Sequence, residues 1–116
     1  MPDPTPLPPT GPVSLDQFQR LIESMFGAKD AKRGPEATFL WLAEEVGELA
    51  AALRETSGGG GDRANLALEF ADVLAWLATL ANIAGVDLTD AVRAKYGSGC
   101  PGCGAAVCRC GDAVKP

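Results

Sequence analysis

The chain has 116 residues and a mass of 11.9 kDa, which leaves room for one domain with a short appendage and excludes a multidomain enzyme. Acidic residues outnumber basic ones by 15 to 10, and the net charge of −5 disfavours a nucleic-acid polymer as a partner. Histidine is absent, so any acid–base or metal chemistry must come from carboxylates and thiols.

Residues 1–13 are rich in proline and lack an apolar pattern, which predicts a disordered or polyproline-like tail. The chain opens without a basic and apolar leader, and no run of about 18 apolar residues follows, so we expect a cytoplasmic protein with no membrane partner. Ser14 and Gln17 form a capping-box pattern, and the apolar residues after them keep helical spacing until Gly27, which predicts the first helix.

Three more helices are expected, and the sequence has no alternating strand pattern and no internal repeat. Pro35 suits the first position of a helix, Asp62 and Asp87 suit helix caps, and Gly85 suits the left-handed residue after a helix end. The predicted ranges are 35–55, 63–84 and 88–96, so residues 14–97 are expected to form one all-α domain, followed by a tail at 98–116.

The third predicted helix is apolar around nearly its whole circumference. A small chain with three other helices cannot cover such a helix on all sides, so we expect an oligomeric bundle, either a homodimer or a dimer of dimers. At about 100° per residue, one stripe holds Leu66, Phe70, Val73, Leu77 and Leu80, while Leu68, Leu74, Trp76 and Ile83 lie on other faces.

Two pairs of acidic residues lie on the second and third predicted helices. Glu45 and Glu48 are three positions apart, as are Glu69 and Asp72, so each pair shares a helix face. A single such pair is usually a solvated face, but two pairs on adjacent apolar helices place four like charges at a partly buried seam, where oxygen ligands suit Mg²⁺ or Mn²⁺. A di-iron carboxylate site is disfavoured, because its usual ligands include histidine.

The complete motif reads Glu44-Glu45-x-x-Glu48, a spacer of 20 residues and Glu69-x-x-Asp72. Together with the segment TFLWLAEEVGELAAAL, it resembles the signature of the MazG-like all-α nucleoside triphosphate pyrophosphohydrolases. The resemblance covers about residues 33–96 and leaves the proline-rich tail and the cysteines outside.

This resemblance implies a helical bundle that oligomerises. It also implies Mg²⁺-dependent hydrolysis of a (deoxy)nucleoside triphosphate to the monophosphate and pyrophosphate, as part of nucleotide-pool housekeeping. By motif position, the metal ligands are Glu45, Glu48, Glu69 and Asp72, and Glu44 is an accessory carboxylate.

Such a reaction needs further groups around the metal. Glu44 or Glu45 could orient or deprotonate the attacking water, provided that coordination does not consume it fully. Trp76 lies one turn after Asp72, where its indole could stack on a base or pack in the core, whereas Trp41 suits the core or an interface. The candidate cations for the phosphates are Lys32, Arg33, Arg93 and Lys95.

All four cysteines lie in the predicted C-terminal tail with the spacing C-x₂-C-x₄-C-x-C. Four thiolates can close a tetrahedral Zn²⁺ site, so we predict a short structural tail similar to a zinc knuckle. Disulfides and free surface thiols remain alternatives. The candidate zinc ligands are Cys100, Cys103, Cys108 and Cys110.

A function without catalysis is the alternative to the enzyme. The chain could be a catalytically silent helical oligomer, with a zinc-binding tail as its interaction module and acidic residues that serve solubility. Mg²⁺-dependent release of pyrophosphate from a panel of nucleotides separates the two functions.

Overall fold

The computed structural model describes residues 5–115, and the regular elements within that range are all helices, in agreement with the all-α prediction. Of the tail predicted at 1–13, residues 1–4 lie outside the described part and residues 5–13 form neither helix nor strand. The elements in chain order are α1 (Leu15–Arg33), α2 (Pro35–Thr56), the 3₁₀ turn η1 (Ser57–Gly59), α3 (Arg63–Ala84) and α4 (Leu88–Tyr96).

Local side chains define most helix ends. The Ser14 hydroxyl accepts a hydrogen bond from the backbone N–H of Gln17 (3.0 Å), and the Gln17 side chain accepts one from the Ser14 N–H (2.7 Å), which completes the capping box. Asp62 and Asp87 each accept a bond from the N–H three residues on, at 3.1 and 3.0 Å. Gly85 has a φ of 70° and ends α3. These predicted caps and ends are confirmed.

The predicted end of the first helix at Gly27 is wrong, because α1 continues to Arg33. One glycine inside a helix costs only about 1 kcal/mol relative to alanine, so Gly27 is tolerated. The helix ends instead at Gly34, which has a φ of 82° and precedes Pro35. The additional turns of α1 position the wall of the candidate site.

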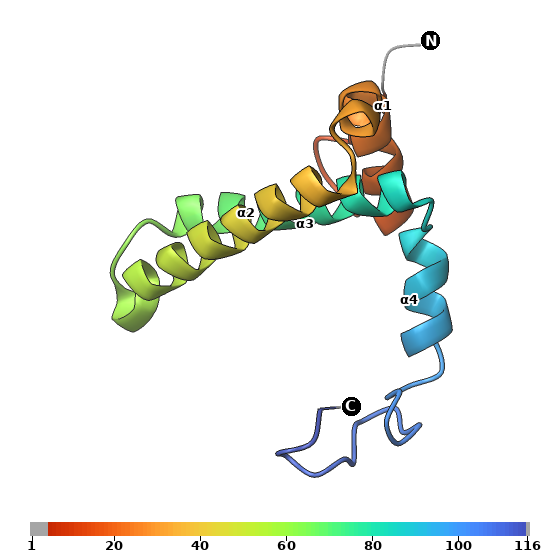
Figure 1. Ribbon diagram of the computed structural model, residues 1–116. Coiled ribbons are helices and arrows are strands. Elements are labelled where there is room, and N and C mark those ends of the chain that lie inside the picture. The colour runs from red at the N-terminus through yellow and green to blue at the C-terminus, as the bar shows by residue number, and fades with distance from the viewer. Residues whose placement is uncertain (1–4, 116) are drawn as a thin grey trace.

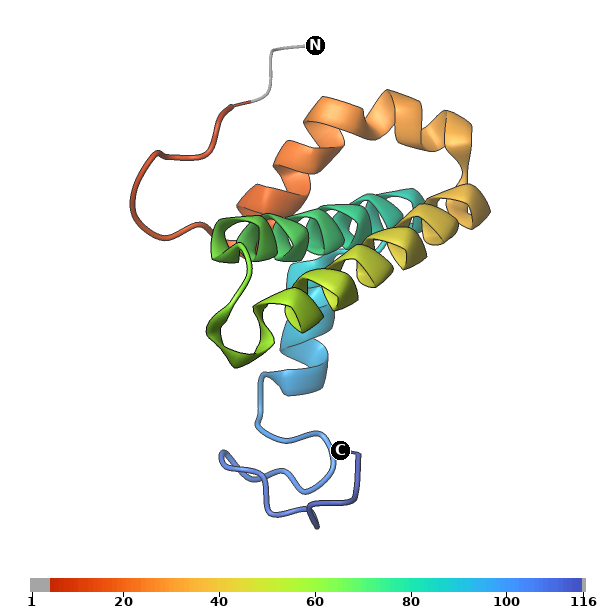
Figure 2. The same cartoon turned by 90° about the vertical axis from the view of Figure 1, so that its left-hand side faces the viewer.

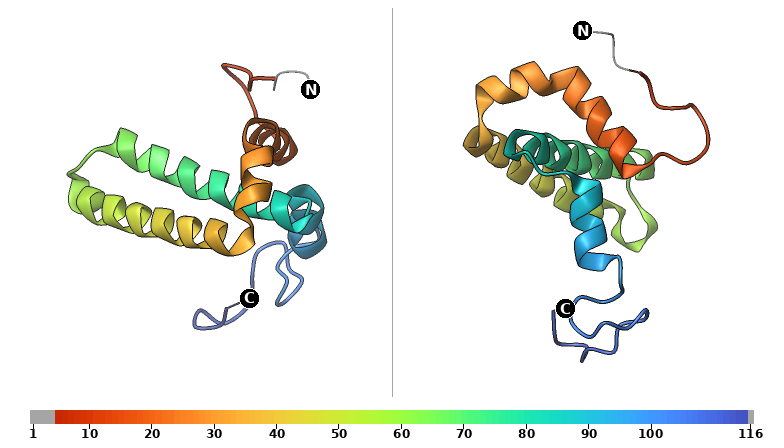
Figure 3. Two further views of the ribbon diagram at one scale, coloured as in Figure 1. Left: turned by 45° about the horizontal axis from the view of Figure 1, so that its top comes forward. Right: turned by 90° about the vertical axis from the view of Figure 1, so that its right-hand side faces the viewer.

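Helices α2 and α3 run side by side in opposite directions, as Figure 1 shows. Helix α1 lies across the end of this pair where α2 begins and α3 ends (Figure 2), and the cysteine segment extends beyond α4 (Figure 3). The connection between α2 and α3 is tight, since a Cβ atom on Gly61 would lie 2.7 Å from the carbonyl oxygen of Glu55. The pairing of α2 and α3 brings the two acidic motifs onto one surface.

A buried glutamine fastens α1 to this arrangement. The side chain of Gln19 is fully buried and donates hydrogen bonds to Asn82 Oδ1 (3.0 Å) and to the carbonyl oxygen of Val86 (2.8 Å). It also accepts a bond from the backbone N–H of Leu88 (2.8 Å). Because buried polar groups need such partners, these bonds hold α1 over the turn that joins α3 to α4.

One copy of the chain leaves much of its apolar surface uncovered, as the pattern of α3 predicts. Leu68 and Phe70 of α3 are 64% and 52% exposed. The accessible surface is 8308 Å², whereas a compact protein of this mass exposes about 6,000 Å². Within residues 5–115, the buried hydrophobic residues are Ile22, Ala52, Leu66, Ala78 and Ala81.

By length and composition alone, α3 is also apolar enough to cross a membrane, with a mean hydropathy of 1.5. It carries Glu69 and Asp72 near its middle, and charged residues at the centre of a bilayer are costly. It packs against α1 and α2.

Candidate active site

The antiparallel pair α2 and α3 brings carboxylates from both helices together. One oxygen each from Glu45, Glu48 and Glu69 lie within 4.8 Å of one another. Asp72 falls outside this group of three, but its charge acts on Glu45 and on Glu69, and it lines the adjoining cavity. Glu44 is exposed and also lies outside the group. The four predicted metal ligands therefore share one region of the surface.

The electrostatics of this cluster are unfavourable when no cation is bound. Burial raises the pKa of Glu45 above its ordinary value of 4.5, and the charges of Glu48 and Asp72 raise it further, while a hydrogen bond from Trp76 opposes the shift. Burial raises the pKa of Glu69 as well, again with contributions from Glu48 and Asp72. No positively charged side chain of the described residues is among the groups that shift these two carboxylates.

Two atoms of this cluster are left without a partner. The Oε2 atoms of Glu45 and Glu69 are buried, and neither accepts a hydrogen bond from the described residues. A buried carboxylate oxygen without a donor is costly unless a cation meets it. All potential ligands are oxygens, which is the donor set that Mg²⁺ and Mn²⁺ prefer. The residues therefore fit a hard divalent cation.

A cavity of about 440 Å³ adjoins the carboxylates. Its size lies in the range typical of small-molecule sites. Asp72 belongs to both the acidic cluster and the cavity, so a ligand in the cavity lies next to the carboxylates. The lining residues come from α1, α2 and α3 and are Phe26, Lys29, Asp30, Arg33, Trp41, Asp72, Ala75, Trp76 and Thr79.

Arg33 is held rigidly in the wall of this cavity. Its guanidinium carbon lies 4.9 Å from the ring centroid of Trp76 and 5.5 Å from that of Trp41. The two indoles meet edge to face at 5.1 Å. Arg33 also forms an ion pair with buried Asp30 and donates a hydrogen bond to Thr38 Oγ1 (2.9 Å). Its charge is therefore largely compensated within the protein.

The structure places the two tryptophans in the same wall. Trp76 is half-buried and lines the cavity, where it can contact a ligand. Of the two places expected for Trp41, the core of one copy is wrong, because its side chain is 51% exposed and lines the cavity beside Trp76. The interface between copies stays a prediction.

The predicted cations are not brought together. Of the four, Arg33 lines the cavity and Lys32 does not, although both lie near the end of α1. Arg93 and Lys95 belong to α4, where Arg93 pairs with Asp90 at 3.5 Å, and neither lines the cavity.

Lys29 lines the cavity and is absent from the sequence-based candidates. It lies four positions before Arg33, so the two residues share one face of α1. The spacing of four residues between Lys29 and Arg33 is present in the sequence. It indicates a shared helix face only when the helix is continued beyond Gly27.

The four cysteines form a second cluster in the segment that follows α4. Their sulfur atoms lie within 4.8 Å of one another, and all four are free thiols. A hydrogen bond from the backbone N–H of Arg109 lowers the pKa of Cys103 to about 6, whereas the contact with Cys108 raises the pKa of Cys110 to about 11. Cys100 lies at the centre of the sulfur contacts.

Comparison with known proteins decides the family. Residues 33–103 match the MazG nucleotide pyrophosphohydrolase domain, which is more than half of the chain. The chain belongs to the MazG family. A relative from Cyanophage S-2L, named dATP/dGTP diphosphohydrolase, is 38% identical over 84 residues, which cover 72% of this chain and 71% of the relative. This MazG-family protein is accordingly a nucleoside triphosphate pyrophosphohydrolase, and the family supports the enzyme over the silent oligomer.

The unfavourable charge of the cluster predicts that Glu45→Gln raises the melting temperature of the metal-free protein at neutral pH, since it removes a negative charge beside Glu48 and Asp72. A raised pKa in the folded state means that the stabilising contribution of Glu45 is complete below 4.5 and is lost as the pH rises through the folded pKa. The difference between variant and wild type should therefore shrink as the pH falls toward 4.5.

Thermal unfolding in the presence of a chelator, as a function of pH, measures this effect. Glu44→Gln is the matched control, because Glu44 is exposed and neighbours Glu45 in the chain. Equal melting temperatures for the two variants at every pH would contradict the account of the cluster.

Proposed function

We propose that this MazG-family enzyme hydrolyses purine deoxynucleoside triphosphates to the monophosphate and pyrophosphate, using Mg²⁺ or Mn²⁺ held by Glu45, Glu48, Glu69 and Asp72. The observation that carries the proposal is the group of three carboxylates with oxygens within 4.8 Å of one another, two of which have a buried oxygen without a partner. The name of the cyanophage relative supports the choice of substrate. We assign the activity to nucleotide-pool housekeeping in the cytoplasm.

The reaction brings a polyanionic substrate to an acidic surface. When bound, Mg²⁺ supplies the positive charge that makes this approach favourable and acidifies the attacking water. Glu45 is the proposed proton acceptor, because it lies in the group of three carboxylates and its buried Oε2 accepts no hydrogen bond from the described residues. Glu44 is the alternative, since it is exposed and outside the group of three.

The cavity next to Asp72 is the proposed nucleoside site. Trp76 offers an indole on which a base can stack, and Trp41 supports it edge to face at 5.1 Å. Lys29 is the proposed phosphate contact from α1, because Arg33 is already paired with Asp30. Arg33 would then act through the two indoles by holding them in place.

Loss of a proposed metal ligand is expected to abolish hydrolysis without unfolding the protein. Glu48→Gln or Asp72→Asn removes a charged ligand and keeps the shape of the side chain, so Mg²⁺-dependent release of pyrophosphate from dATP and dGTP should fall by about 100-fold or more. Glu55→Gln, at the exposed end of α2, is the control and should retain full activity. Undiminished turnover in both ligand variants, with circular dichroism unchanged, would refute the site.

The two lysines at the end of α1 give a matched test of the cavity. Lys29→Gln is expected to raise the KM for the triphosphate about tenfold, equivalent to about 1.4 kcal/mol, with little change in kcat. Lys32→Gln makes the same change of charge on the same helix, but away from the cavity, and should leave the KM unchanged. Equal effects from both lysines would indicate long-range attraction instead of a contact.

We further propose that the enzyme works as a homodimer or a dimer of dimers. Both α2 and α3 expose apolar side chains, and the largest exposed fractions on these helices are those of Leu40 (67%), Leu68 (64%) and Phe39 (57%). Exposed apolar surface of this kind marks an interaction site, and a second copy of the chain can bury it. The predicted role of Arg93 and Lys95 in substrate binding then requires that α4 reaches the site of another copy.

Light scattering at micromolar concentration tests the assembly. We expect a particle of about twice or four times the mass of one chain, because the apolar faces of α2 and α3 associate. Leu68→Glu should shift the population toward single chains, whereas Ala67→Glu, also exposed on α3, adds the same charge and removes no large side chain. A monodisperse particle of 11.9 kDa for the wild type would contradict the proposal.

A further inference from the structure

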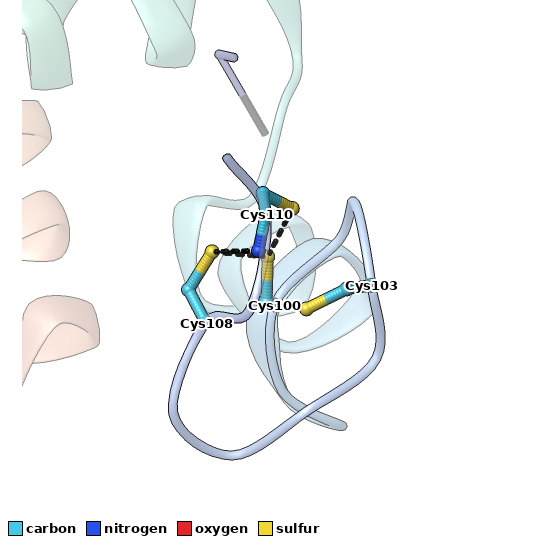
Figure 4. A group of neighbouring side chains, drawn as sticks. All are labelled: Cys100, Cys103, Cys108 and Cys110. Carbon is cyan, nitrogen blue, oxygen red and sulfur yellow. Dashed lines mark hydrogen bonds between the residues drawn. The ribbon is translucent and has the colours of Figure 1, made fainter. Parts of the chain in front are cut away.

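The thiol cluster at the C-terminal end lies apart from the carboxylate site and is not used in hydrolysis. Figure 4 shows the side chains of Cys100, Cys103, Cys108 and Cys110 converging from a single loop. The sulfur of Cys100 lies 3.5 Å from that of Cys108 and 3.9 Å from that of Cys110. With Zn–S bonds of about 2.3 Å, the edge of a regular tetrahedron of sulfurs is about 3.8 Å. The sulfurs are thus spaced like the ligands of one Zn²⁺ ion.

This spacing differs from that of disulfides. Bonded sulfurs lie about 2.05 Å apart, whereas each of the four cysteines is a free thiol. Uncharged thiols attract one another only weakly and thiolates repel one another, so neither form explains why four sulfurs lie together. A shared cation explains why they converge.

Backbone donors also point at the sulfurs. The N–H groups of Gly102, Arg109 and Cys110 donate hydrogen bonds to the sulfurs of Cys100, Cys103 and Cys108, at 3.4, 3.3 and 3.3 Å respectively. Such donors stabilise thiolates, which are the form of cysteine that binds metal. Backbone hydrogen bonds therefore favour the metal-binding thiolate form at three of the four cysteines.

Two glycines make the fold of the loop possible. The N–H of Cys100 donates to the carbonyl oxygen of Ala105 (2.9 Å), and the N–H of Gly104 donates to the carbonyl oxygen of Cys100 (2.7 Å). A Cβ atom on Gly99, which has a φ of 115°, would lie 2.9 Å from two carbonyl oxygens. Gly104 adopts a φ of 73°, in the left-handed region. The turn that holds the first two sulfurs is thus built into the sequence.

The segment has almost no apolar core that could hold it in this shape. The described residues after Tyr96 form neither helix nor strand. The side chain of Val107 is 82% exposed and that of Val114 is 59% exposed. Small segments of this kind usually depend on a metal or on disulfides for their fold.

We propose that Cys100, Cys103, Cys108 and Cys110 bind one Zn²⁺ ion, and that this ion folds the segment after α4. Soft thiolate ligands select Zn²⁺ over the Mg²⁺ or Mn²⁺ of the carboxylate site, so the enzyme has two metal sites of different chemistry. Four protein ligands leave no open position for a substrate, so the zinc is structural. The proposal is independent of the proposed hydrolysis.

Metal analysis of the full chain tests this site. Protein purified under reducing conditions without chelator should contain about one zinc per chain. Reconstitution with Co²⁺ should produce the intense visible absorption of tetrahedral cobalt together with charge transfer from thiolate. In the double variant Cys103→Ser and Cys108→Ser, the zinc and the cobalt bands should both be lost. Val107→Ser, in the same loop but not a ligand, should keep both.

Zinc removal tests whether the ion folds the segment. It should collapse the amide chemical-shift dispersion of residues 99–110 and leave the helical signals in place. Absence of zinc, a mass lower by two hydrogens per disulfide, or full zinc content in the double variant would each overturn the proposal. The result for hydrolysis is separate, since an inactive enzyme that retains zinc would refute the carboxylate site alone.

Discussion

Repulsion among carboxylates on two neighbouring helices is the constraint on which this structure depends. Glu45, Glu48 and Glu69 bring their oxygens within 4.8 Å of one another, and burial makes the charges harder to sustain. A chain selected only for stability would place smaller or neutral side chains there. The arrangement suits an enzyme that binds a divalent cation, because the cation attracts each carboxylate and offsets the repulsion among them.

The rest of the fold serves this cluster. The tight connection at Gly61 turns α3 back along α2, so that two acidic motifs separated in the sequence meet. Gln19 fixes α1 across the opposite end of the pair, where α3 ends, and the last turns of α1 place Lys29 and Arg33 in the wall of a cavity beside Asp72. A cationic and aromatic wall therefore adjoins an anionic one, which is the polarity that a nucleotide with bound metal requires.

The local structure and the acidic motifs could be predicted from the sequence because their determinants are local. The caps at Ser14, Asp62 and Asp87 act over three residues, and the i,i+3 spacing puts each acidic pair on one face. The cavity could not be predicted, since it depends on how α1 crosses the other helices. Ending the first helix at Gly27 left Lys29 outside the helix. Of the two places expected for Trp41, the core of one copy is wrong because one copy buries so little of its apolar surface.

The position of bond cleavage tests the central claim most directly. Hydrolysis of dATP and dGTP with Mg²⁺ in water enriched in ¹⁸O, followed by mass spectrometry and phosphorus NMR of the products, identifies the phosphorus atom that is attacked. Attack at the α-phosphorus should give equal amounts of deoxynucleoside monophosphate and pyrophosphate, with the label in the monophosphate. Formation of the diphosphate and inorganic phosphate, or label in pyrophosphate, would contradict it.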